Sequence, residues 1–261
     1  MSSLAQHFTR LPQDLRACLA FLSRLPIRAK PEPSEERPLA VSSACLPLAG
    51  MLIALTPAVI LSLIISFGGS TVLAAAVALG AMALITGGLH EDGLGDTADG
   101  FGGGKTREER LAIMHDSRIG TYALLALLFT VIIKVVALGE ISQSVGVGAF
   151  SIICVAALSR ALAYAHWTSL PPARKDGVAS WAGWPKTSDL GFAVLLSVPA
   201  ILILIVMFPF TGLLAIILAT LGVFSFSTMA RRLIGGHTGD TIGASEQIAA
   251  TILFATLALG A

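Results

Sequence analysis

Seven long apolar runs separated by polar stretches are the feature that most constrains how this chain can fold. They span residues 45–66, 71–89, 121–139, 146–167, 190–208, 211–229 and 247–261. A helix needs about 20 apolar residues to cross the hydrocarbon of a bilayer, and most of these runs approach that length. The chain is 55% hydrophobic and 13% charged, whereas a soluble domain carries about 25% charged residues. We therefore expect an all-α, polytopic integral membrane protein with about seven apolar segments.

The ends of this series differ from its middle. Residues 1–44 form a polar leader, and residues 45–261 are expected to form a single membrane-embedded catalytic domain. Within the leader, residues 11–26 place leucines at helical spacing, which favours an amphipathic helix that lies on the membrane or packs on the other segments. The prolines between residues 31 and 38 predict a linker. The last run, 247–261, is short, so it either spans the membrane or is re-entrant or interfacial.

The distribution of Lys and Arg predicts the topology. With the amino terminus inside, residues 1–44, 90–120, 168–189 and 230–246 lie inside and contain fifteen of the seventeen basic residues. The short intervening loops contain none, which is a strong positive-inside signal. We therefore expect the amino terminus and every long polar loop on the cytoplasmic face. The net charge of +1 and the absence of a dense basic run exclude nucleic acid as a partner.

The stretch from Gly88 to Thr121 concentrates the acidic residues of the chain, with seven of the sixteen. Asp92, Asp96 and Asp99 lie at i, i+4 and i+7, which places three carboxylates on one face if the segment is helical. No Lys or Arg between residues 90 and 104 offsets them. Hard oxygen ligands beside a membrane suit Mg²⁺, although a solvated acidic loop is the plainer alternative and the glycines weaken a helix.

Two neighbouring features bear on the same chemistry. His90 precedes the carboxylates and is a candidate general base, an orienting group or a hydrogen-bonded anchor. Residues 100–106 resemble a phosphate-binding P-loop, but the first glycine of that pattern falls on Asp99 and no strand precedes it. We reject the P-loop and keep a flexible lid or another phosphate contact as alternatives.

Further candidates for binding phosphate follow along the chain. A short helix is expected across Arg107 to Arg118, where Arg118 either binds a phosphate or anchors the next segment. Near the end, a glycine-rich turn offers backbone N–H groups, and its acid adds a metal ligand. The residues of this second cluster are Gly235, Gly236, His237, Thr238, Gly239 and Asp240.

Arg160 and Lys134 fall inside apolar segments, where a charge requires a partner or water. Trp181 and Trp184, between the fourth and fifth runs, are expected to anchor the membrane interface.

The longest motifs carry a family resemblance. Residues 90–100, read HEDGLGDTADG, and residues 110–121, read RLAIMHDSRIGT, strongly resemble the cobalamin synthase family, also called adenosylcobinamide-GDP ribazoletransferase. Residues 21–26 and 236–240 extend the similarity over nearly the whole chain. Gly95 departs from the pattern, which has an alanine there, and Gly102 to Gly104 enlarge a variable segment.

The resemblance implies a Mg²⁺-dependent transferase of the cell inner membrane that acts near the end of adenosylcobalamin synthesis. It implies joining of adenosylcobinamide-GDP to α-ribazole, or to its 5′-phosphate, with release of GMP. The catalytic residues expected from the motif are His90, Asp92, Asp96 and Asp99, and the last three are also the expected metal ligands. Arg118, Gly236, His237, Thr238 and Asp240 are the expected substrate-binding residues. Membrane lipid surrounds such a protein, and a homo-oligomer remains open.

Two other functions fit parts of the pattern. A CDP-alcohol phosphotransferase of lipid synthesis also carries aspartates beside a membrane helix, but no Ala-Arg follows Asp92-Gly93, and Asp96 and Asp99 are three residues apart rather than four. A divalent-cation transporter places its ionisable groups near the middle of the membrane. We expect every acid of this chain in a loop or at the end of a segment, which disfavours transport.

Overall fold

The computed structural model describes residues 3–27, 39–174 and 182–261, and this part of the chain is helical. An isolated bridge between Pro172 and His237 is its one β-type pairing. The all-α expectation is therefore confirmed, whereas the predicted linker and Trp181 lie outside the described residues. The elements are α1 (Ser3–Leu22), α2 (Leu39–Ser42), η1 (Ser43–Cys45), α3 (Leu46–Ser66), α4 (Thr71–Thr86), α5 (Leu89–Gly103), α6 (Arg107–Ile113), α7 (Thr121–Ile141), α8 (Val145–Ser169), α10 (Thr187–Met207), α11 (Thr211–Ile234) and α12 (Gly239–Ala258).

Six stretches of the described chain are long and apolar enough to cross a membrane as single helices. They are Leu39–Ser66, which contains α3, and the helices α7, α8, α10, α11 and α12. The last of these begins at Gly239, eight residues before the apolar run that predicted it. The expectation that residues 230–246 form a loop was therefore wrong, because most of them belong to the end of α11 and the first half of α12.

The second predicted run is a helix broken by a sharp bend. α4 ends at Thr86, and α5 leaves it at an angle of 88°. Gly87 and Gly88 form this corner with φ angles of 67° and 70°, a left-handed conformation that glycine adopts without steric penalty. We treat α4 as the spanning part of the pair. The acid-rich α5 then lies outside the spanning segments, at the polar end of the bundle.

α8 and α12 form the centre of the bundle. Within their most apolar stretches, 61% of α8 and 67% of α12 is buried, against 28% of α7 and of α10. Small residues allow this close packing: a side chain at Gly50 of α3 would lie 2.5 Å from the carbonyl oxygen of Ala156 in α8. The exposed faces of the outer helices carry many large apolar side chains, as expected for helices that contact lipid.

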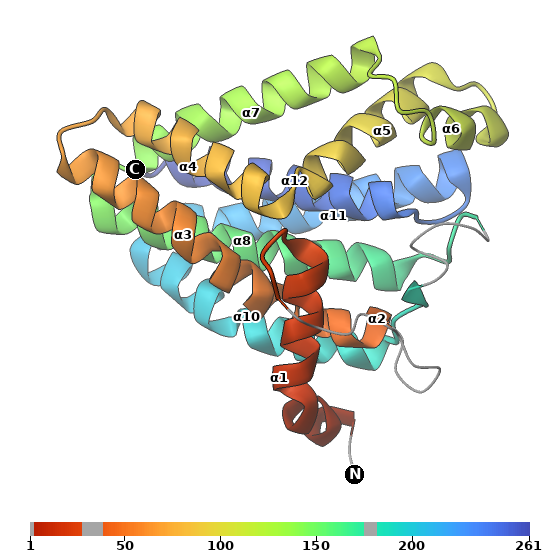
Figure 1. Ribbon diagram of the computed structural model, residues 1–261, viewed down its shortest axis with the longest axis horizontal. Helices are drawn as coiled ribbons and strands as arrows, with labels where there is room; N and C mark the ends of the chain where they lie inside the picture. Colours follow the sequence, from red (N-terminus) through yellow and green to blue (C-terminus); the bar gives the residue numbers. More distant parts are fainter. Residues whose placement is uncertain (1–2, 28–38, 175–181) are drawn as a thin grey trace.

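The leader helix α1 packs against α2, η1, α3 and α10, and runs across the direction of the long helices (Figure 1). Cys18 and Leu22 are buried in this contact. The ring of His7 stacks on Phe192, and its Nε2 forms a hydrogen bond with Oδ1 of Asp189 at 3.1 Å. Of the two alternatives for the leader, packing on the other segments is therefore confirmed. The helix starts at Ser3 rather than at residue 11 and continues through Pro12.

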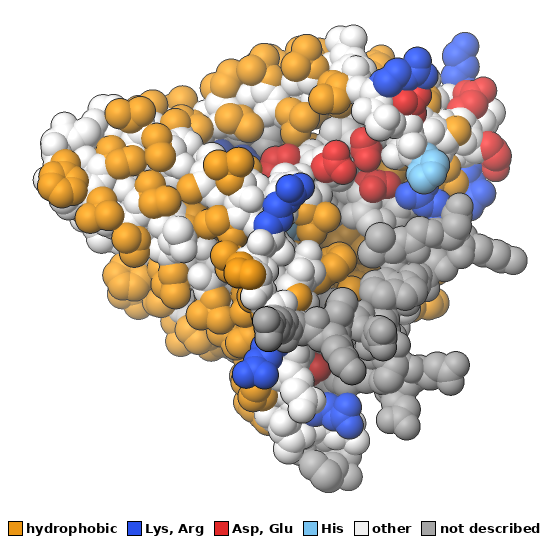
Figure 2. All heavy atoms as spheres, in the orientation of Figure 1, with side chains coloured by type: hydrophobic (Ala, Val, Ile, Leu, Met, Phe, Trp, Pro, Cys, Tyr) orange, Lys and Arg blue, Asp and Glu red, His pale blue; other side chains and the backbone are white. Residues whose placement is uncertain are grey.

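Polar and apolar side chains are separated along the length of the molecule. Figure 2 shows apolar side chains over most of the visible face, while acidic and basic side chains gather at the end where α5 and α6 lie. The short connections from α3 to α4, from α7 to α8 and from α10 to α11 lie at the other end (Figure 1). The polar segments singled out in the sequence therefore share one end of the bundle.

Candidate active site

The glycine-containing stretch after the bend is a helix, so the three aspartates lie on one face of α5. Asp92, Asp96 and Asp99 line a single cavity of about 310 Å³ at the polar end of the bundle. Asp240, from the first turn of α12, lines the same cavity. The helical spacing expected from the sequence is confirmed. The cavity therefore brings together three carboxylates of α5 and one of α12, although Asp99 and Asp240 are 141 residues apart in the sequence.

Two glycines bring these helices into contact. A side chain at Gly93 would lie 2.7 Å from the carbonyl oxygen of Asp240, and one at Gly243 would lie 3.3 Å from the Cα of His90. Because neither position has a Cβ, the backbone of α5 rests directly on the first turns of α12. This contact places Asp92 and Asp96 beside Asp240.

The neighbouring acids affect the pKa of Asp96. Partial burial, followed by the carboxylates of Asp92, Asp240 and Asp99, raises the pKa of Asp96 to about 7, and Arg174 opposes this only in part. Carboxylates that crowd without enough compensating cations favour a bound cation or a shared proton. The site therefore has the electrostatic character expected of a cation-binding centre.

Asp99 has a structural function that the sequence did not predict. One carboxylate oxygen accepts from the backbone N–H of Gly120 at 2.6 Å, and the other from that of Ala123 at 2.9 Å. These N–H groups begin α7, so Asp99 caps the start of that helix from α5. Each oxygen of Asp99 thus accepts one backbone hydrogen bond and keeps a second lone pair, so the ligand set of Asp92, Asp96 and Asp99 stays a prediction.

Asp240 is held by its neighbours at the mouth of the cavity. Its Oδ2 accepts from the hydroxyl of Thr238 at 3.1 Å and lies 3.4 Å from the guanidinium of Arg174. Among the described residues, no three His, Cys, Asp or Glu side chains meet closely enough to hold a metal ion in the rotamers they adopt. The donors are nevertheless all oxygens, as Mg²⁺ prefers, and the exposed side chain of Asp92 can change rotamer within nanoseconds.

Arg118 reaches the cavity from the segment after α6. Its guanidinium is exposed and forms a bidentate pair with Asp116, in which Nε donates to Oδ1 at 3.1 Å and Nη2 donates to Oδ2 at 2.6 Å. The expected short helix ends at Ile113, earlier than predicted, so Asp116 and Arg118 lie beyond it. An exposed guanidinium already turned to one carboxylate can exchange it for a phosphate with little loss.

The turn before α12 is packed rather than open. The N–H of His237 donates to Pro171 at 2.9 Å, and that of Thr238 donates to the hydroxyl of Thr241 at 2.9 Å. A Cβ at Gly236 would lie 2.1 Å from the carbonyl oxygen of Pro171. The N–H groups of His237 and Thr238 are therefore not available to phosphate, whereas the prediction for the other N–H groups of this turn stays a prediction.

His237 itself is fully buried beside Trp167. Burial lowers the pKa of His237 to about 4, so the ring is neutral at pH 7 and offers no charge to an anion. Within the turn, Asp240 alone lines the carboxylate cavity.

The glycines after Asp99 also have a packing role. Gly100 and Gly103 belong to the last turn of α5, and a Cβ at Gly100 would lie 2.4 Å from the side chain of Met114. A helix at these glycines agrees with the rejection of a P-loop. It does not agree with a flexible lid, because α5 continues through these glycines and α6 packs against them.

His90 lies at the inner end of α5, away from solvent, with 6% of its surface exposed. Its Nδ1 is 4.0 Å from Oε2 of Glu246, a buried acid in the middle of α12. The expectation that every acid lies in a loop or at the end of a segment was wrong for Glu246. The polar residues at 246 and 247 instead belong to a spanning helix.

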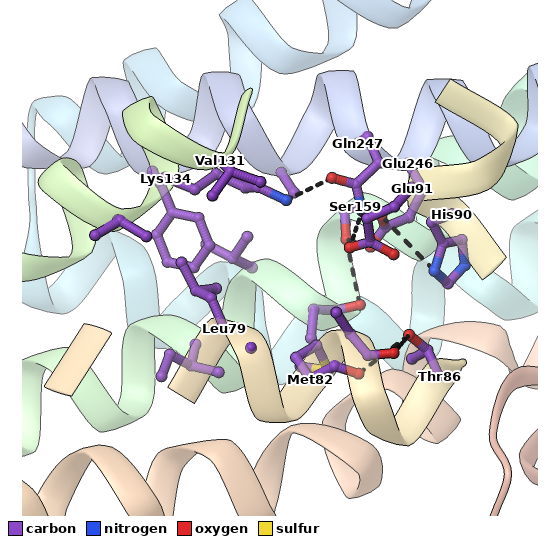
Figure 3. A pocket seen from close by; sticks show the side chains of 18 of the residues that line it. Leu79, Met82, Thr86, His90, Glu91, Val131, Lys134, Ser159, Glu246 and Gln247 are labelled. Carbon is purple, nitrogen blue, oxygen red and sulfur yellow. Dashed lines mark hydrogen bonds and ion pairs between the residues drawn. The ribbon is translucent and has the colours of Figure 1, made fainter. Parts of the chain in front are cut away.

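Glu246 anchors a network of buried charges that the sequence did not reveal (Figure 3). Its Oε1 accepts from Arg160 at 3.2 Å and from Ser159 at 2.8 Å, which supplies the partner that an arginine inside a membrane segment requires. Lys134 donates to Gln247, which in turn donates to Glu91 at 3.0 Å. The network joins α5, α7, α8 and α12 at one end of a cavity of about 220 Å³ whose remaining walls are apolar.

Comparisons with known proteins agree with this architecture. The family described as cobalamin-5-phosphate synthase matches residues 14–258. An adenosylcobinamide-GDP ribazoletransferase of a Sinorhizobium species is 43% identical over 252 residues, covering 94% of this chain and 96% of the relative. The protein of that name from Rhizobium etli is 44% identical over 241 residues, covering 90% and 92%. The one from Azorhizobium caulinodans is 41% identical over 247 residues, covering 92% and 93%.

No solved structure matches the chain. The family match extends from the leader helix to the end of α12, and these relatives match along almost their full length. The resemblance noted in the motifs around α5 is thereby confirmed, and the chain belongs to the cobalamin-5-phosphate synthase family of cobalamin biosynthesis.

Proposed function

We propose that the chain joins adenosylcobinamide-GDP to α-ribazole, or to its 5′-phosphate, and releases GMP in a Mg²⁺-dependent reaction. The observation that carries this proposal is the cavity where Asp92, Asp96 and Asp240 meet Arg118 and Arg174. Carboxylates for a cation and guanidinium groups for phosphate are the two kinds of group that a diphosphate substrate requires. The names of the relatives supply the substrates; the cavity supplies groups suited to them.

Mg²⁺ at this cavity would neutralise the diphosphate and the charge that develops on the leaving phosphate. Asp92, Asp96 and Asp240 would be its principal ligands, because each oxygen of the buried Asp99 already accepts one backbone N–H at the start of α7. Arg118 and Arg174 would then bind the phosphate oxygens that the cation leaves free. Asp99 would keep α7, and with it the segment that carries Arg118, in register with α5.

The reaction forms one bond and breaks one. A ribose hydroxyl of the acceptor attacks the phosphorus linked to cobinamide, and the bond from that phosphorus to the bridging oxygen breaks, so that GMP leaves with this oxygen. The hydroxyl proton would pass to Asp92 or His90, both of which belong to the first turn of α5. Asp92 is exposed and His90 is buried, so Asp92 is the group that substrate meets first.

The polar end of the bundle would face the cytoplasm, where nucleotide substrates are found, and the membrane would be the inner one. The positive-inside distribution of Lys and Arg supports this orientation. Substrates would then reach the carboxylate cavity without crossing lipid.

The test is GMP release by the purified protein in detergent, with adenosylcobinamide-GDP and α-ribazole, with and without Mg²⁺. Asp96→Asn removes one cavity carboxylate and should lower the rate by at least about a hundredfold, since each group that stabilises transition-state charge contributes on that order. Glu108→Gln is the matched control, because Glu108 is an exposed acid of the same polar end that does not line the cavity. Equal rates for the two variants would contradict the proposed site.

Two further assays separate the rival functions. Release of CMP from a CDP-alcohol, with no release of GMP, would indicate a phospholipid-type phosphotransferase. Uptake of Mg²⁺ into proteoliposomes in the absence of nucleotides would indicate a transporter, and the buried Glu246 would then be the residue to substitute first.

A further inference from the structure

A second cavity lies on the other side of Asp92 and Asp240. It has a volume of about 270 Å³ and is enclosed by α1, α3, α5, α8 and α12. Asp92 and Asp240 line both this cavity and the carboxylate cavity. A molecule bound in the second cavity is therefore within reach of the groups that would perform the phosphate chemistry.

The walls of this cavity are mostly apolar, with two polar groups that lack partners. Phe21, Leu22, Leu46 and Leu89 supply apolar side chains from three helices. Trp167 is 3% exposed, and its Nε1–H has no hydrogen-bond partner among the residues that the structure describes. A buried N–H without a partner is unfavourable, which favours a ligand that accepts a hydrogen bond.

Arg160 offers a second donor of the same kind. The side chain of Arg160 is buried, with 2% of its surface exposed, and its Nε–H has no hydrogen-bond partner among the described residues. Its Nη1 donates a hydrogen bond to Glu246. Both donor residues belong to α8 and line this cavity. Its ligand therefore needs an apolar body and a small number of acceptor atoms.

The size of the cavity restricts which substrate part can enter. Pockets for drug-sized ligands measure about 300–1,000 Å³, so a cavity just below that range admits one ring system and excludes a corrinoid macrocycle. Guanine has donors and acceptors around most of its edge; because the carboxylates of Asp92 and Asp240 are assigned to the cation, the other walls, which are mostly apolar, would leave most of that edge unpaired. A fused aromatic base whose second nitrogen is free to accept one hydrogen bond meets all three requirements.

We propose that this cavity, the base cavity, binds the flat aromatic base of the acceptor nucleoside, with a donor from Trp167 or Arg160 on its free ring nitrogen. This assignment rests on the proposed function. It directs the ribose toward Asp92 and Asp240, where the attacking hydroxyl is needed. It also gives the leader helix a role, because Phe21 and Leu22 of α1 form one wall of the base cavity.

Filling the cavity tests the proposal kinetically. Ala163 of α8 lines the base cavity, and Ala156 of the same helix lines the separate cavity beside Glu246. Ala163→Leu should raise the KM for α-ribazole at least about tenfold, as expected when a pocket loses the space for part of its ligand, and leave the KM for adenosylcobinamide-GDP unchanged. Ala156→Leu is the matched control and should change neither KM.

Fluorescence gives a second measurement that does not need turnover or a filled cavity. The chain has three tryptophans, so Trp181→Phe with Trp184→Phe leaves Trp167 as the single reporter. Adding α-ribazole should quench or shift its emission in a saturable way, and adding GMP should not.

The outcomes separate this inference from the proposed function. If the wild type releases GMP but Ala163→Leu keeps the acceptor KM, or if α-ribazole leaves the emission of Trp167 unchanged, the base cavity is wrongly assigned. If GMP instead changes the emission, the cavity binds the donor nucleotide and the proposal is overturned. If the wild type releases no GMP while α-ribazole still binds beside Trp167, the proposed reaction fails and the cavity stands.

Discussion

Two glycines of α5 that lie two residues apart, Gly93 and Gly95, differ in whether they tolerate a side chain. A Cβ at Gly93 would collide with the backbone of Asp240, whereas a Cβ at Gly95 would meet Ala123 and Leu127 at 3.5 and 3.6 Å, which is ordinary packing distance. The alanine expected from the family at position 95 therefore fits this structure. The departure from the motif leaves the site unchanged.

This difference gives a matched pair of substitutions. Gly95→Ala should raise the stability of the protein by about 0.5–1 kcal/mol, because alanine is the better helix former, and keep GMP release intact. Gly93→Ala should separate α5 from α12 and lower both stability and activity. Melting temperature in detergent and the GMP assay measure the two effects. A Gly93→Ala protein with normal activity would show that the close contact of these helices is not needed.

Asp96 predicts how stability depends on pH. Its pKa is raised to about 7 in the folded protein, whereas an unfolded Asp titrates near 3.9. The folded state thus holds the proton more tightly, so this group favours folding at low pH and loses that contribution as the pH rises through 7. Without Mg²⁺, Asp96→Asn should therefore melt higher than the wild type at pH 8.

The same comparison at pH 4 is the control, since there the acid is protonated in the folded protein and the advantage of Asn should be smaller. Mg²⁺ at pH 8 should stabilise the wild type and not Asp96→Asn, because the cation replaces the proton. If Asp96→Asn melts lower than the wild type at pH 8 without Mg²⁺, then the crowding of carboxylates at this cavity is not the dominant effect.

At the scale of elements, apolar length predicted the spans well and their starting points less well. The run at 247–261 was identified, but α12 begins at Gly239, because Glu246 and Gln247 interrupt the apolar pattern while remaining inside the helix. Their hydrogen bonds to Ser159 and Glu91 make these positions tolerable in the bundle. Such partners come from other helices, so a pattern read along one segment does not reveal them.

The helix α5, which carries Asp92, Asp96 and Asp99, formed where the sequence offered weak support for a helix. Its glycines reduce helix propensity, so the sequence supported the i, i+4, i+7 arrangement only conditionally. The structure forms the helix because those glycines meet other backbone: Gly93 meets α12, and Gly100 meets α6. Tertiary packing therefore outweighs local propensity here.

The capping of α7 by Asp99 predicts a loss of stability that does not depend on metal. Asp99→Ala leaves the N–H groups of Gly120 and Ala123 without their acceptor, which should lower stability by about 1–2 kcal/mol. Asp92→Ala, at an exposed position, should change metal-free stability little and instead remove the stabilisation by Mg²⁺. Melting temperatures with and without Mg²⁺ distinguish the two. A loss of the Mg²⁺ effect in Asp99→Ala, with normal metal-free stability, would return Asp99 to the ligand set.

At the scale of the whole molecule, the sequence located both polar clusters at one end through the count of Lys and Arg. It did not reveal that α5 lies directly on α12, because that contact depends on the corner at Gly87 and Gly88. It indicated that Arg160 needs a partner or water but did not identify Glu246 of α12 as that partner. Contacts between distant segments carry this part of the site, and one sequence holds no record of them.

The bend between α4 and α5 makes the topology testable. If α4 crosses the membrane, the spanning helices are α3, α4, α7, α8, α10, α11 and α12, an odd number. The carboxyl terminus then lies opposite the polar end, on the periplasmic side under the proposed orientation. Alkaline phosphatase, which needs disulfides and so is active only outside the reducing cytoplasm, should be active when fused after Ala261 or inserted at Gly68. The same insertion at Lys105, between α5 and α6, should be inactive. An inactive fusion at Ala261 together with an active insertion at Gly68 would contradict the proposed seven-span topology. Inactivity at both positions would mean that the polar end faces the other way or that α3 does not span.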